Sequence, residues 1–155
     1  GAEGGEKTVQ VKARGGQPAR EIAADLLVVA FGSRTQLDLV PGASDHACPF
    51  GDAQDALNLK SWLQGLPSPG DSGRKRTVVV VGGGVSGVEL AASVAAAYGK
   101  KVSVRLVTPG SDIMPSFAAS HRRSAWQALS RAGVDVVLGS KALEVEERGV
   151  THEAA

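Results

Sequence analysis

The strongest hydrophobic pattern lies in the second half of the chain. The uninterrupted apolar run Thr77–Val81 (TVVVV) predicts a strand that is buried on both faces. A glycine-rich turn follows, and small apolar residues over Val85–Tyr98 predict a helix. The next expected elements are a strand, a helix closed by glycine and a third strand: Val102–Val107, Phe117–Ala132 and Val134–Leu138. Strands that alternate with helices predict an α/β fold, here a Rossmann-like βαβαβ unit with a parallel sheet.

The first half of the chain is expected to be rich in strands. Thr8–Lys12 alternates polar and apolar residues, as a half-buried strand does. A second predicted strand starts near Arg20 and becomes continuously apolar at Leu26–Ala30, which is typical of burial on both faces. Asp52 is a candidate N-cap for a helix that carries Leu63.

Breaks in composition suggest a domain division. Pro67–Gly73 (PSPGDSG) has the composition of a linker. We therefore expect a first part at 1–66, a linker at 67–76 and a nucleotide-binding unit at 77–147. A further strand is expected at Ala142–Glu147, with a turn at Arg148-Gly149 after it. The start, GAEGGEK, carries neither Met nor a signal-peptide pattern, so the chain is interpreted as the middle segment of a longer protein.

Charge and cysteine content exclude several classes of protein. The net charge of +1 gives no reason to expect a nucleic-acid or membrane-surface partner. Cys48 is the only cysteine, which rules out a CxxC pair within these residues and favours a reducing compartment.

The motif that carries chemistry is Gly82-Gly83-Gly84-Val85-Ser86-Gly87, a GxGxxG sequence between a predicted buried strand and a predicted helix. Gly82 permits the tight turn out of the strand, and Gly84 lets the backbone approach a pyrophosphate. Gly87 lets the helix pack closely on the sheet. A dinucleotide pyrophosphate would bind the free N–H groups at the positive end of the helix. The alternative is a tight turn that binds nothing.

The second strand ends at Thr108, where this fingerprint usually has Asp or Glu for the adenosine ribose. A neutral residue there removes the repulsion of a 2′-phosphate, and Thr108 and Ser111 lie at the correct edge to donate hydrogen bonds to it. NADPH, or use of both coenzymes, is therefore favoured over strict NADH. The alternative is nearly as well supported: Thr108 is only a loop residue, and NADH binds through backbone contacts.

Other charged residues are weaker candidates. Arg74–Arg76 and Lys100-Lys101 precede strands, roughly 17 Å from the edge where ligands bind, and are interpreted as solvated. Arg122-Arg123 is a weak candidate for contact with the adenosine. A carboxylate at Glu89, in the first turns of the helix, is stabilised by the helix dipole, which is a sufficient structural reason for its presence. The functional interpretation places Glu89 near the nicotinamide end of the coenzyme. The three histidines are expected on the surface: His46, His121 and His152.

These motifs together resemble the FAD-dependent pyridine nucleotide oxidoreductases. The stretch at 26–33 (LLVVAFGS) is similar to the family strand that returns from the FAD domain and ends in A-T/x-G-S; Phe31 stands where Thr is usual, and Gly32 is retained. Gly82–Glu89 (GGGVSGVE) is similar to the G-x-G-x-x-G-x-E of the family's NAD(P)H domain. The finer likeness is to type II NAD(P)H–quinone dehydrogenases of the plastid and cyanobacterial branch, through 37–43 (LDLVPGA) and 48–50 (CPF).

This resemblance implies FAD as prosthetic group, hydride transfer from NAD(P)H to the flavin, and reduction of a lipid quinone such as plastoquinone. Gly32 then belongs to the FAD side, and membrane association is expected only through regions outside these residues. A plastid location is suspected, with a mitochondrion or the cytoplasmic face of a bacterial membrane as alternatives. The segment alone is expected to be inactive. Two other functions stay open: a non-catalytic NAD(P)-binding regulatory module, and a related flavoprotein whose acceptor is ferredoxin, a disulfide or oxygen.

Overall fold

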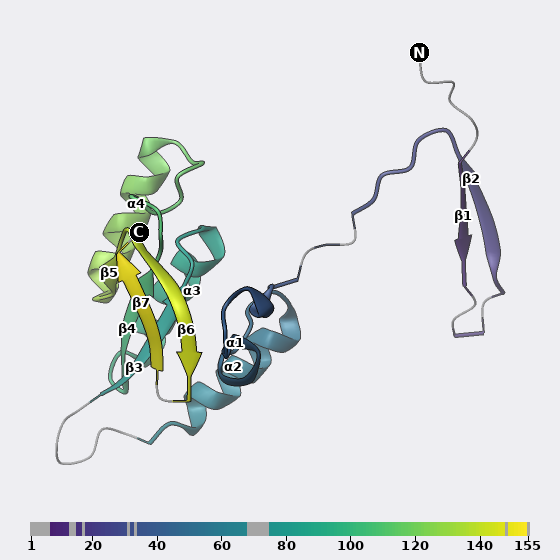
Figure 1. Ribbon diagram of the computed structural model, residues 1–155. Coiled ribbons are helices and arrows are strands. Elements are labelled where there is room, and N and C mark those ends of the chain that lie inside the picture. The colour runs from purple at the N-terminus through teal and green to yellow at the C-terminus, as the bar shows by residue number, and fades with distance from the viewer. Residues whose placement is uncertain are drawn as a thin grey trace. The chain divides into compact units, whose positions relative to one another are not determined.

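The computed structural model describes residues 7–12, 15–16, 18–30, 32, 34–67, 75–147 and 149–154. The chain divides into two compact units, Gly1–Ser33 and Arg34–Ala155 (Figure 1). Each unit is described by itself.

The first unit contains an antiparallel hairpin. Strand β1 (Lys7–Val11) pairs with β2 (Arg20–Ala24), with Val9 opposite Ile22. The strand predicted at Thr8–Lys12 is confirmed to within one residue. In this two-stranded sheet Ile22 stays 43% exposed, because a hairpin alone offers little to pack against.

The prediction that the second strand continues through Leu26–Ala30 is wrong. Strand β2 ends at Ala24, and residues 26–30 belong to no strand or helix. Leu26 is 76% exposed and Val28 is 74% exposed. A strand buried on both faces needs neighbouring strands and a covering layer on each side. The described residues of this unit supply only the β1–β2 hairpin, so the apolar run has nothing to cover it.

The second unit is built on the predicted parallel sheet. Strands β3 (Arg76–Val81), β4 (Val102–Val107) and β5 (Asp135–Val137) lie in the order β3-β4-β5, and both pairings are parallel. Val81 lies opposite Val107, which lies opposite Val137, so the carboxyl ends of the three strands share one edge. The Rossmann-like fold class is confirmed.

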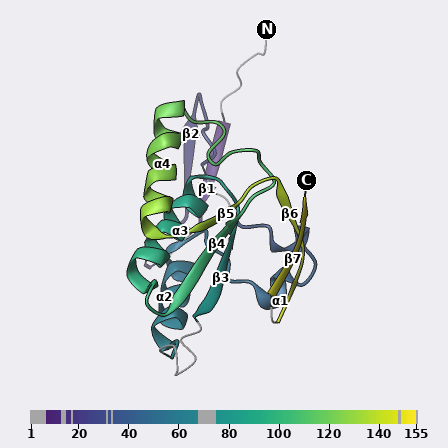
Figure 2. The ribbon, with the colours of Figure 1, turned by 90° about the vertical axis from the view of Figure 1, so that its left-hand side faces the viewer.

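Helices α3 (Val85–Tyr98) and α4 (Ala119–Ala132) cover one face of this sheet (Figure 2). The core between these layers is almost fully buried and consists of small and branched apolar side chains: Val88, Ala91, Val94, Val102, Val104, Leu106 and Leu129. Helix α4 starts two residues later than predicted, and its predicted end is confirmed. Gly133 closes it with φ 72°, a left-handed conformation that favours glycine.

Residues 34–66 belong to the second unit. They form the 3₁₀ helix η1 (Leu37–Leu39), the short helix α1 (Ala43–His46) and α2 (Ala53–Gly65). Asp52 is confirmed as N-cap of α2, because its Oδ1 accepts a hydrogen bond from the Asp55 N–H at 2.9 Å. Leu63 and Leu66 join the core of the second unit. The compact units therefore separate at Ser33/Arg34, whereas the sequence suggested a division near residue 67.

The opposite face of the sheet carries an antiparallel hairpin of β6 (Ser140–Glu146) and β7 (Gly149–Ala154) (Figure 2). The strand predicted at Ala142–Glu147 is confirmed as part of β6 except at Glu147, which is a turn residue. The Val145 N–H donates to the Pro41 carbonyl at 2.9 Å, which ties the segment before α1 to this hairpin. Residues 68–74, most of the linker predicted at 67–76, lie outside the described residues. In the described part of the chain, no helix has the length and apolar character to cross a membrane.

Candidate nucleotide-binding site

The glycine turn joins the end of β3 to the start of α3. Gly82 has φ 123°, a conformation that side-chain-bearing residues rarely adopt, and its N–H donates to the Val107 carbonyl at 2.9 Å. A Cβ on Gly87 would lie 2.0 Å from the Gly82 carbonyl oxygen. The turn is therefore tight because the helix backbone passes directly against the strand end, as the sequence motif predicts.

Gly84 differs from Gly82 and Gly87, the other two glycines of the GxGxxG pattern. Its φ of −73° and ψ of 179° are open to any residue, and a Cβ there would meet no atom within 4 Å. No packing or backbone geometry in the described structure requires glycine at this position. A side chain at Gly84 would extend into this open space, so glycine leaves the space in front of the helix free.

The N-terminus of α3 has free N–H groups beside this open space. Val88 is the first residue of the turn whose N–H bonds within the helix, to the Gly84 carbonyl at 3.0 Å. The preceding residues, Val85, Ser86 and Gly87, occupy the helix positions whose N–H groups have no intrahelical acceptor, and Gly84 has no side chain to cap them. No acidic residue lies in the first turn. The partial positive charge of the helix end is therefore available to an anion.

Thr108 lies next to the glycine turn, but its side chain points inward. The residue is 6% exposed, and a Cβ on Gly83 would lie 2.6 Å from its Oγ1. Its Oγ1 also accepts a long hydrogen bond from the Gly110 N–H at 3.4 Å. Ser111, three residues further along the same loop, is exposed. Of the two hydroxyls that the sequence analysis placed at this edge, only that of Ser111 lies on an exposed residue.

The loop between β4 and α4 is held in place by Asp112, which the sequence analysis did not single out. Its carboxylate accepts hydrogen bonds from Trp126 Nε1 at 2.8 Å, Arg122 Nε at 2.9 Å and the Ile113 N–H at 2.8 Å. The hydrogen bond from Trp126, then the Ile113 amide and the Arg122 charge, hold the pKa of the Asp112 carboxyl below its ordinary value, although desolvation opposes them. Spacing alone could not reveal this contact, because it joins a loop to the second and third turns of a helix.

Most other charged candidates lie away from this edge or are engaged elsewhere. Arg122, a weak candidate for the adenosine, is occupied by Asp112 and also donates to the Phe117 carbonyl. Lys101 Nζ donates to the Leu66 carbonyl at the end of α2 at 2.9 Å, and Lys75 Nζ donates to the Gly99 carbonyl at the end of α3. These lysines therefore satisfy carbonyls at helix C-termini, which is a structural role. Glu89 is exposed on α3, and the three histidines are exposed as predicted.

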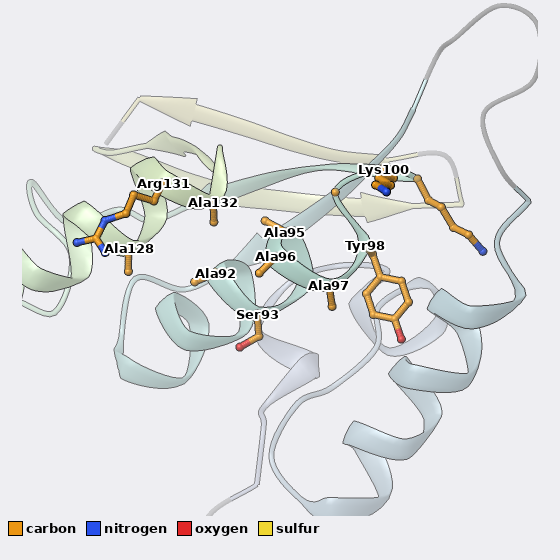
Figure 3. A pocket seen from close by; sticks show the side chains of 12 residues that line it. Ala92, Ser93, Ala95, Ala96, Ala97, Tyr98, Lys100, Ala128, Arg131 and Ala132 are labelled. Carbon is orange, nitrogen blue, oxygen red and sulfur yellow. The ribbon is translucent and has the colours of Figure 1, made fainter.

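A separate open groove of about 1050 Å³ runs between the C-terminal halves of α3 and α4. Figure 3 shows Ala92, Ala96 and Tyr98 of α3 and Ala128 and Arg131 of α4 around it. Helix α3 has 14 residues and is about 20 Å long, so its C-terminal end is far from the glycine turn. The groove therefore does not belong to the candidate site.

Comparison with known proteins gives a family match over nearly the whole chain. Residues 2–155 match the pyridine nucleotide-disulphide oxidoreductase family. The chain is 34% identical over 113 residues to demethylphylloquinone reductase NdbB of Synechocystis sp., covering 73% of this chain and 28% of that protein. It is 33% identical over 120 residues to the alternative NAD(P)H-ubiquinone oxidoreductase C1 of Arabidopsis thaliana, covering 77% of this chain and 23% of that protein. The chain thus spans about a quarter of the length of these relatives.

Solved structures support the fold. The NDH2 structure from Plasmodium falciparum in complex with NADH matches with a TM-score of 0.67 at 20% identity, over 88% of this chain and 32% of that one. An FAD-dependent pyridine nucleotide-disulphide oxidoreductase from Desulfovibrio vulgaris matches with a TM-score of 0.58 at 26% identity, over 94% of this chain and 36% of that one.

Proposed function

Because the chain belongs to the pyridine nucleotide-disulphide oxidoreductase family, we propose that it forms the NAD(P)H-binding part of a longer flavoprotein that reduces a quinone. The observation that carries this proposal is the open space at Gly84 before an uncapped helix N-terminus. The names of the relatives support the acceptor, because they describe a demethylphylloquinone reductase and several NAD(P)H-ubiquinone oxidoreductases.

The residues present fit the diphosphate of NAD(P)H. The turn Gly82-Gly83-Gly84 would bring the backbone close to it, and the N–H groups of Val85, Ser86 and Gly87 would donate to its oxygens. A side chain at Gly84 would fill the space that the diphosphate needs. Glu89, exposed on the following turn of α3, would lie toward the nicotinamide half.

The adenosine end would lie over the loop after β4. Thr108 supplies a neutral, buried side chain in place of a carboxylate, and Ser111 supplies an exposed hydroxyl. Neither repels a 2′-phosphate, so we expect the protein to use NADPH or both coenzymes. Strict use of NADH, held by backbone contacts alone, is the alternative.

Gly32 is the one described residue that we assign to the FAD side. A Cβ there would meet no atom within 4 Å, so its surroundings in this structure leave room for a ligand or another part of the protein. The exposed apolar residues before it, Leu26, Val28 and Val29, suit a strand that other parts of a flavin domain would cover. When bound, NAD(P)H would supply a hydride for FAD, and the complete protein would pass the electrons to a lipid quinone such as plastoquinone.

A plastid location fits relatives described as cyanobacterial and as chloroplastic/mitochondrial, and a mitochondrion is the alternative. Any association with a membrane is assigned to parts of the protein outside these residues.

The test is a purified complete protein studied without oxygen. We expect bound flavin whose absorbance is bleached by NADPH or NADH and restored by a soluble quinone. A protein that binds the nucleotide but contains no flavin would instead be a regulatory module. Flavin that is bleached but reoxidised only by ferredoxin, a disulfide or oxygen would change the acceptor.

A further inference from the structure

We propose that Asp112 is a positioning residue that holds the β4–α4 loop against the glycine turn, so that the loop is ready to receive the adenosine half of the coenzyme. This inference rests on the proposed function. The carboxylate touches no part of the assigned diphosphate site and acts through the backbone that follows it.

The first step is the link from Asp112 to α4. One carboxylate oxygen accepts from Trp126 Nε1 at 2.8 Å and from the Ile113 N–H at 2.8 Å, while the other accepts from Arg122 Nε at 2.9 Å. Arg122 also donates to the carbonyl of Phe117. The two ends of the segment 112–117 are therefore fastened to the same arginine, and the loop cannot move away from α4 without breaking these contacts.

The second step is the link from the loop to the glycine turn. Ile113, next to Asp112, is completely buried in the core between the sheet and the helices. The following residue, Met114, has φ 48°, which is uncommon for a residue with a side chain. In this conformation its N–H donates to the Gly83 carbonyl at 2.7 Å. Asp112 therefore holds Ile113 in place through its N–H, and Ile113 directly precedes Met114, whose N–H bonds the glycine turn.

The other side of the loop is tied to the sheet. The Thr108 N–H donates to the Val137 carbonyl at 3.0 Å, and the Gly139 N–H donates to the Gly110 carbonyl at 2.9 Å. Between Gly110 and Met114, Asp112 is the side chain with three hydrogen bonds to its surroundings, and exposed Ser111 lies directly before it. Removing the carboxylate should therefore loosen the part of the loop that faces the adenosine.

The experiment compares coenzymes with and without the adenosine half. The complete flavoprotein is assayed with ferricyanide as acceptor, using NADH, NADPH and reduced nicotinamide mononucleotide, which lacks adenosine. Asp112→Ala is expected to raise KM for NADH and NADPH about five- to tenfold, because several hydrogen bonds that preorganise the loop are lost. The values of kcat and of KM for the mononucleotide should stay unchanged.

Asp135→Ala is the matched control. Asp135 also accepts from an arginine Nε, that of Arg105 at 2.7 Å, but it lies at the start of β5, away from the loop. Removing the Asp135 carboxylate should leave KM for NADH and KM for NADPH unchanged. Trp126→Phe replaces the indole by a smaller aromatic ring and removes the Nε1–H donor, so it should raise KM for NADH about two- to threefold even if Asp112→Ala fails to fold.

Three results would decide against the inference. Unchanged KM for NADH and NADPH in a flavin-loaded Asp112→Ala protein would overturn it, as would an equal rise for the mononucleotide, which would indicate a general structural defect. A wild-type protein that oxidises none of the three substrates would contradict the proposed function itself and the inference with it.

Discussion

Replacing Gly84 is expected to separate coenzyme binding from folding. The structure leaves open space around an added Cβ, and the backbone at φ −73° and ψ 179° is allowed for alanine and valine. Alanine is a poorer N-cap than glycine, which should cost about 1 kcal/mol of folding free energy or less. A valine at this position should therefore leave a folded protein with its flavin bound.

The cost to binding should be larger. A side chain at Gly84 keeps the diphosphate away from the N–H groups at the start of α3. Losing two hydrogen bonds to a charged group, at about 1.5 kcal/mol each, amounts to about 3 kcal/mol, or more than a hundredfold in Kd. The two effects differ enough to be measured independently.

The assay is a titration of the complete protein with NADPH and NADH, together with its thermal midpoint and flavin content. Gly87→Ala is the contrasting variant, because its Cβ would lie 2.0 Å from the Gly82 carbonyl oxygen and should lower stability by about 1–3 kcal/mol. Normal nucleotide affinity in a folded Gly84→Val protein would show that the space in front of the helix has no role in binding.

Three further changes test other parts of the account. Ser111→Glu should raise Kd for NADPH about tenfold more than Kd for NADH, because Ser111 is exposed and a carboxylate there would face the 2′-phosphate; equal changes, with Ser111→Ala as control, would contradict this placement. Gly133→Ala should lower the free energy of unfolding by about 1–2 kcal/mol in urea titrations, because φ is 72° there, whereas Gly133→Asn should lose less. The lowered pKa of Asp112 means that its charged form stabilises the fold at neutral pH and that this stabilisation is lost as pH falls below the ordinary value of 3.8. The stability difference between wild type and Asp112→Asn should therefore shrink in acid, and a difference that stays constant would argue against an ionised Asp112.

Local patterns were sufficient to predict the central unit. The strand–turn–helix around Gly82–Gly87 was predicted because each step depends on residues that are adjacent in the chain: a run of valines, glycines in the turn and small residues in the helix. The N-cap of α2 at Asp52 and the end of α4 at Gly133 were predicted for the same reason, since each depends on contacts within one helical turn.

Features that depend on distant partners were not predicted. The burial of Leu26–Ala30 was inferred from composition, but burial requires neighbours that the described residues do not provide. The Asp112 contacts reach Arg122 and Trp126, and no sequence spacing indicates which way a loop carboxylate turns. One missed feature did have a signal: Val102, Val104 and Leu106 alternate inward along β4, which places Thr108 on the same buried side.

Amide hydrogen exchange of the complete protein with and without NADPH or NADH shows whether the coenzyme binds at the start of α3. Peptides that cover 82–89 should gain protection when the coenzyme binds, because their free N–H groups acquire acceptors, while peptides at the far end of α3, near residues 96–101, should not change. Coenzyme binding that protects the groove between α3 and α4 and leaves 82–89 exchanging as before would contradict the account.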